Sequence, residues 1–150
     1  MSETTLKALE SNGSEMMNRG QVDLNAMDAF IVHQEFRGTA QWNRLFLYRL
    51  NQELEQRLSE PTLNVTKLAE LMALSRRTLH RKLKNLLHTT PNLLIRRCRL
   101  ERGALLLGSG KSVMDTAILV GFDSPSYFTQ CFKQQFGVTP RAYTIRRLCG

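Results

Sequence analysis

The chain has 150 residues, of which 42% are hydrophobic and 23% charged, which is typical of one ordinary globular domain or two very small ones. No stretch approaches the ~20 apolar residues that a membrane-spanning helix needs, and the polar N-terminus lacks the pattern of a signal peptide. The three widely separated cysteines indicate reduced thiols rather than a disulfide or metal framework, so we expect a cytoplasmic protein.

The net charge of +8 is distributed unevenly along the chain. Residues 1–60 carry 6 Lys/Arg and 9 Asp/Glu, whereas residues 61–150 carry 15 Lys/Arg and 4 Asp/Glu. A basic surface of this kind attracts phosphate backbones, and counterion release strengthens the attraction. The charge alone does not show whether the protein binds nucleic acid, because a protein without such a partner can also have a basic surface.

The first part of the chain predicts a flexible polar lead and then one long helix. The lead covers residues 1–40, and within it residues 22–32 could form a short helix. From Ala40 onward, apolar residues recur at helical spacing until a break at Ser59–Pro61, and we expect them to form one stripe facing the core. The stripe consists of Trp42, Leu45, Phe46, Leu50, Leu54 and Leu58.

An internal repeat follows Pro61. Residues 65–74 align with residues 113–122, and residues 75–91 align with residues 124–140 once Asp123 is skipped. The alignment holds only seven identities in 27 positions, but they fall at core and cap positions, which makes chance less credible. Each copy predicts a short helix, a tight turn and a second helix.

Cap residues mark the ends of the predicted helices. Ser75 and Ser124 can each accept a backbone N–H at the start of a second helix. Gly121 is suited to a turn that needs a positive φ. Thr90-Pro91 and Thr139-Pro140 each begin a further helix, because proline is favoured at the first helical position.

The helix predicted for residues 91–107 links the two copies. Its apolar residues, which we expect to pack inward, are Leu94, Cys98, Leu100, Ala104, Leu105 and Leu107. Its arginines, Arg96, Arg97, Arg99 and Arg102, occupy the remaining positions. The predicted fold is all-α, with about seven helices and two helix-turn-helix subdomains, residues 41–107 (including the linker helix) and 108–150.

In a helix-turn-helix unit the second helix enters the major groove of DNA and reads base edges. In the first copy Arg77, His80 and Arg81 share one helical face, and an arginine can clamp guanine with two hydrogen bonds, so we predict that these three read bases. Arg76, Lys82 and Lys84 are predicted to contact phosphates. In the second copy the predicted base-reading residues are Pro125, Ser126, Thr129 and Gln130, and Lys133 is predicted to contact phosphate. This second helix carries little charge, so it remains open whether it reads fewer bases or mainly supports the first copy.

The order and spacing of many motifs over about residues 41–146 resemble the DNA-binding domain of the AraC/XylS family of bacterial transcription regulators. The second copy carries Ala117, Gly121-Phe122, Ser126-Tyr127-Phe128, Phe132-Lys133, Gly137 to Pro140, and Tyr143; the first carries Leu68-Ala69, Ser75, Leu79, Arg81, Lys84, Thr90-Pro91 and Arg99-Leu100. The resemblance implies seven helices, two helix-turn-helix units, an asymmetric DNA site and activation through contact with RNA polymerase. The chain departs from the family pattern at His88, where glycine is usual, and at Thr116, where a large apolar residue is usual.

The sequence argues against an enzyme but leaves two other functions open. The three histidines, His33, His80 and His88, lack carboxylate or cysteine partners at useful spacing, and no phosphate-binding glycine-rich loop occurs, so we predict no enzyme, no cofactor and no metal. A helical protein-interaction module and a non-specific basic DNA binder remain open alternatives. Members of the family commonly carry a sensing or dimerising domain, and residues 1–40 are too short to be one, so we expect a stand-alone member or a piece of a larger regulator.

Overall fold

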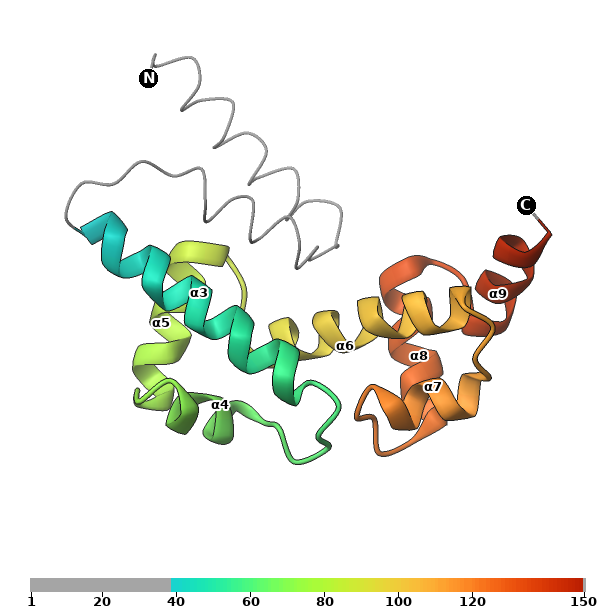
Figure 1. Ribbon diagram of the computed structural model, residues 1–150, viewed down its shortest axis with the longest axis horizontal. Helices are drawn as coiled ribbons and strands as arrows, with labels where there is room; N and C mark the ends of the chain where they lie inside the picture. The colour runs from blue at the N-terminus through green and yellow to red at the C-terminus, as the bar shows by residue number, and fades with distance from the viewer. Residues whose placement is uncertain (1–38, 150) are drawn as a thin grey trace, which may run out of the picture.

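The computed structural model describes residues 39–149, and within this range every regular element is an α-helix (Figure 1). The helices are α3 (Thr39–Arg57), α4 (Val65–Leu71), α5 (Arg76–Leu87), α6 (Pro91–Gly108), α7 (Val113–Leu119), α8 (Pro125–Phe136) and α9 (Pro140–Leu148). The prediction of about seven helices is confirmed. The lead over residues 1–40 and the candidate helix at residues 22–32 lie outside the described residues, apart from the first two residues of α3.

The first core is formed by α3, α4, α5 and the first half of α6. Its fully buried centre includes Leu50, Leu68 and Leu83, one from each of the three helices that precede α6. The predicted stripe on α3 is only partly right, because Trp42 is 72% exposed and Leu45 is 57% exposed. Both residues precede the buried Phe46 and Leu47, so the part of α3 that packs into the first core begins later than the predicted stripe.

The second core is formed by the second half of α6 together with α7, α8 and α9. It is rich in aromatic rings, with Phe128 packed edge-on against Phe122 at 5.2 Å between centroids and Phe132 packed edge-on against Tyr143 at 5.4 Å. The prediction that Leu105 packs inward is wrong, because this side chain is 77% exposed. The buried face of this part of α6 runs through Leu100, Ala104 and Leu107, and successive helical residues point about 100° apart.

Helix α6 belongs to both units. Leu94, Ile95 and Cys98 join the first core, whereas Leu100, Ala104 and Leu107 join the second. The two cores therefore meet near the middle of a single helix of 18 residues. In Figure 1 this helix lies across the middle of the molecule and connects the two helix-turn-helix units.

The duplication that the sequence predicts is visible in the backbone. The Oγ atoms of Ser75 and Ser124 accept hydrogen bonds from the third residue of α5 and of α8, at 3.1 and 3.3 Å. The turn of each unit contains one residue with positive φ, and these residues are Ala73 at 53° and Gly121 at 81°. The C-caps match as well, since His88 has a φ of 51° where the second copy has Gly137 at 75°. His88 thus adopts a left-handed conformation that glycine adopts at lower cost.

Candidate nucleic-acid interface

Helix α5 has a sharply divided surface. Leu79 and Leu83 are fully buried against the first core, while Arg77, His80, Arg81 and Lys84 are exposed on the other side. These four follow the i, i+3, i+4, i+7 pattern of a single helical face. Arg76 is exposed at the first position, and α5 contains no acidic residue. The exposed face is therefore a strip of hydrogen-bond donors that includes the cations of Arg77, Arg81 and Lys84, and such a strip matches both phosphate oxygens and guanine edges.

Lys82 is placed differently from the other basic residues of α5. It is half-buried, and its ammonium nitrogen lies 5.1 Å from the centroid of the Phe46 ring on α3. A cation over an aromatic ring is stabilised by about 0.5–1 kcal/mol at a site that water can reach. Of the predicted phosphate contacts in α5, Lys82 is thus the one already engaged by another helix.

Helix α8 presents a polar face with little charge. Ser126, Gln130 and Lys133 are exposed, and Pro125 and Thr129 are half-buried at its edge. The opposite side buries Phe128, Cys131 and Phe132 in the second core. The structure thus brings the predicted residues of the second copy to one side of α8, where amide and hydroxyl groups can reach base edges.

The two presenting helices, α5 and α8, are arranged alike. In Figure 1 both rise from the short helix that precedes them, α4 or α7, at the lower edge of the view, so they run in the same sense. At 1.5 Å per residue, the 18 residues of α6 extend over roughly 27 Å. Successive major-groove segments on one side of DNA lie about 34 Å apart. The linker helix is somewhat shorter than this spacing, and because α5 and α8 lie in units at its two ends, their separation is suited to neighbouring groove segments.

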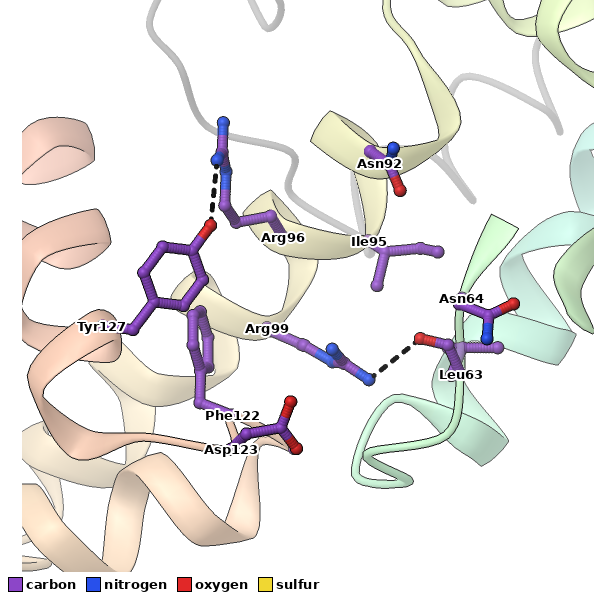
Figure 2. Close-up of a pocket in the computed structure, with 10 residues that line it drawn as sticks. Leu63, Asn64, Asn92, Ile95, Arg96, Arg99, Phe122, Asp123 and Tyr127 are labelled. Atoms are coloured by element: carbon purple, nitrogen blue, oxygen red, sulfur yellow. Dashed lines mark hydrogen bonds between the residues drawn. The ribbon is translucent and has the colours of Figure 1, made fainter. Parts of the chain in front are cut away.

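A cleft of about 330 Å³ lies between the two units (Figure 2). Its walls come from both units and from α6, and include Asn64, Asn92, Arg96, Asp123 and Tyr127. Arg96 of α6 donates from Nη1 to the hydroxyl oxygen of Tyr127 on α8, at 3.5 Å. No role was predicted for these residues, and of the five only Tyr127 is a family motif position.

Arg99, also on the wall of this cleft, is half-buried and donates to three backbone carbonyl oxygens of the segment between α3 and α4. Burial lowers the pKa of its guanidinium, and the negative charge of Asp123 partly opposes that effect. An arginine stays protonated even so, because its ordinary pKa lies far above neutral pH. The sequence analysis placed Arg99 among the outer residues of α6 and at a family motif position; in the structure it joins α6 to the segment between α3 and α4 by three hydrogen bonds. The sequence did contain a pattern that could have indicated these contacts: Arg96, Arg99 and Arg102 are spaced three residues apart, which places them on one side of α6.

The described range of the chain holds neither a candidate metal site nor a membrane-spanning helix. Residues 39–149 contain no group of three or more His, Cys, Asp or Glu that could hold a metal ion. Among the helices α3 to α9, none is long and apolar enough to cross a membrane.

Two helix-turn-helix units that share a linker helix and present polar helices in the same sense define a DNA-binding transcription regulator. A family described as a helix-turn-helix domain matches residues 68–146, and the chain belongs to this family, which is of the AraC type. It is a family of transcription regulators and not a class of enzymes.

Individual relatives agree with this assignment. The chain is 40% identical to the activator RhaS of Yersinia pestis over 96 residues, which cover 63% of this chain and 35% of RhaS. An AraC-type regulator from Chromobacterium violaceum superposes with a TM-score of 0.65 at 29% identity, covering 71% of this chain and 96% of that one. The DNA-binding domain of AdpA, solved with a target DNA, gives a TM-score of 0.62 at 28% identity, covering 66% of this chain and 89% of that one. The chain spans less than half the length of the curated relatives that it matches.

Proposed function

We propose that the chain binds double-stranded DNA sequence-specifically and reads two adjacent major-groove segments, one with α5 and one with α8. The observation that carries this proposal is the pair of N-capped helices that bury one face, expose a polar face and run in the same sense on either side of α6. The AdpA domain, which has a similar fold, was solved with its target DNA, and this supports the proposal.

The two presenting helices would have unequal roles. On α5, Arg77, His80 and Arg81 would read bases, with Arg76, Lys82 and Lys84 on phosphates. On α8, Pro125, Ser126, Thr129 and Gln130 would read bases, with Lys133 on a phosphate. Because α5 carries five Lys/Arg and α8 only one, most of the salt-dependent attraction to DNA would come from α5.

The chain would regulate transcription from the DNA site to which it binds. RhaS is named as a transcriptional activator, and we propose activation for this chain too, through contact with RNA polymerase. The signal to which it responds would be sensed outside residues 39–149, because the described helices are all used in the two units. The site of action would be the cytoplasm.

Selection from a random duplex library, followed by gel-shift titration of the enriched duplexes, tests the proposal. We expect enrichment of two short motifs about one helical turn apart, bound at least about 10³-fold more tightly than random duplex. Binding that is uniform over sequences and controlled only by salt would support a non-specific basic binder. Binding to DNA no better than to heparin would support a protein-interaction module.

Two neighbouring substitutions on α5 test the separation of roles. Arg81→Ala should cost about 1–3 kcal/mol on the selected duplex and relax the preference at one base pair. Lys84→Ala should weaken binding to all duplexes alike and reduce the salt slope by about 1. Lys111→Ala, at an exposed lysine of the loop between α6 and α7, is the matched charge control. If Arg81→Ala and Lys84→Ala both weakened binding to all duplexes by the same factor, the assignment of Arg81 to a base and of Lys84 to a phosphate would be wrong.

A further inference from the structure

Three arginines on one side of α6 reach out to the two units. Arg96 donates to the Tyr127 hydroxyl of the second unit at 3.5 Å, and Arg102 donates to the Glu55 carbonyl oxygen of the first unit at 3.4 Å. Arg99, between them in sequence, makes the most extensive contact. The surface where the two units meet is therefore organised around one helix and its arginines, and Arg99 is at its centre.

Arg99 holds the segment that joins α3 to α4. Its Nε donates to the carbonyl oxygen of Leu58 at 3.1 Å, and its Nη2 donates to those of Glu60 and Leu63 at 2.6 and 3.3 Å. A guanidinium has five N–H donors in a rigid planar fork, so one side chain can hold three acceptors in a fixed geometry. A lysine in its place would keep the charge but lose the fork.

The turn of the second unit closes on the same guanidinium. Gly121 has a φ of 81°, and a Cβ atom at this position would stand 2.9 Å from the Leu58 carbonyl oxygen and 3.1 Å from Arg99 Nε. Such distances are shorter than van der Waals contact, so only glycine allows this approach. The guanidinium thus lies between a loop of the first unit, whose carbonyl oxygens it binds, and the turn of the second, where Gly121 leaves no room for a Cβ atom beside it.

We propose that Arg99 is a positioning residue whose guanidinium, held between the 58–63 segment and Gly121, fixes the orientation of α5 relative to α8 and so sets the half-site spacing that the protein accepts. This inference rests on the proposed function, because it presumes that both helices read DNA. The two cores share only α6, so the orientation of one unit relative to the other depends on the stiffness of that helix and on direct contacts between the units. Each added base pair rotates the second half-site by on the order of 35°, so a spacing preference requires that orientation to be restrained.

The restraint can be measured without DNA, on the full chain. Spin labels at Asn85→Cys on α5 and Gln134→Cys on α8, in a Cys149→Ser background, report the distribution of distances between the presenting helices by double electron–electron resonance. We expect a narrow distribution in the parent and a clearly broader one with Arg99→Lys or Gly121→Ala. Arg97→Gln, at an arginine with no hydrogen bond to either unit within residues 39–149, is the matched control and should leave the width unchanged. An unchanged width in both test variants would overturn the inference.

The second test uses duplexes derived from the selected sequence, with the spacing altered by one base pair or with a single half-site. The parent should prefer its own spacing by about tenfold or more, and Arg99→Lys and Gly121→Ala should reduce that preference to within about threefold. Affinity for a single half-site should stay within about twofold of the parent. If the parent itself shows no spacing preference, the proposal of bipartite reading fails. If the parent shows the preference and both variants keep it, only the role of Arg99 fails.

Discussion

Thr116 offers a direct test of the packing around α7. Its side chain is fully buried, and its hydroxyl oxygen has no hydrogen-bond partner within the described residues. Its Cγ2 lies 3.5 Å from the position that a Cβ on Gly103 of α6 would occupy, so the side chain is enclosed between α7 and α6. Replacing threonine by valine keeps the branched shape and removes the hydroxyl.

We expect Thr116→Val to raise the free energy of unfolding by about 1–3 kcal/mol. A buried polar group without a partner costs about that much, and the apolar burial of the methyl that replaces the hydroxyl acts in the same direction. Helix propensity contributes little, because threonine and valine have similar values. The change is measured by urea denaturation followed by circular dichroism at 222 nm.

Thr144→Val on α9 is the matched control. The Thr144 hydroxyl donates to the Pro140 carbonyl oxygen at 3.0 Å, so the same substitution there removes a hydrogen bond. We expect no gain from it, and a loss of up to about 1 kcal/mol. An unchanged or lowered stability for Thr116→Val, or an equal gain for both variants, would refute the reasoning.

Two further predictions concern a helix end and a buried thiol. His88→Gly should raise the free energy of unfolding by about 1 kcal/mol, because glycine adopts the left-handed conformation without strain, whereas Gly137→Ala should lower it; denaturant midpoints decide both. Burial, with a smaller effect from Glu101, raises the pKa of the Cys98 thiol to about 12, so a thiol reagent at pH 8 should modify the exposed Cys149 and spare Cys98. Since the unfolded thiol has a pKa of 9.0, stability should fall as pH rises from 9 toward 12, by at most about 1.4 kcal/mol per unit, and Cys98→Ala should remove this part of the slope. A steeper or equal slope in Cys98→Ala would contradict the linkage.

The helices and their ends could be predicted from the sequence because they depend on neighbours a few residues apart. Ser75 and Ser124 cap α5 and α8 as predicted, with a backbone N–H only three residues away. The burial of Leu79 and Leu83 followed from helical spacing alone. Asn64 was missed as the cap of α4, although its Oδ1 accepts from the Lys67 N–H at 2.9 Å.

The sequence by itself therefore determined the seven helices, the duplication and the polar faces of α5 and α8, because spacing and capping act over one or two turns. Only the tertiary structure decided that Trp42, Leu45 and Leu105 are exposed, since burial requires a second element and local periodicity does not say where that element ends. It also decided the hydrogen bonds of Arg99, whose acceptors lie 36 to 41 residues earlier in the chain. Contacts over such separations form only once both units have packed on α6, and no local pattern encodes them.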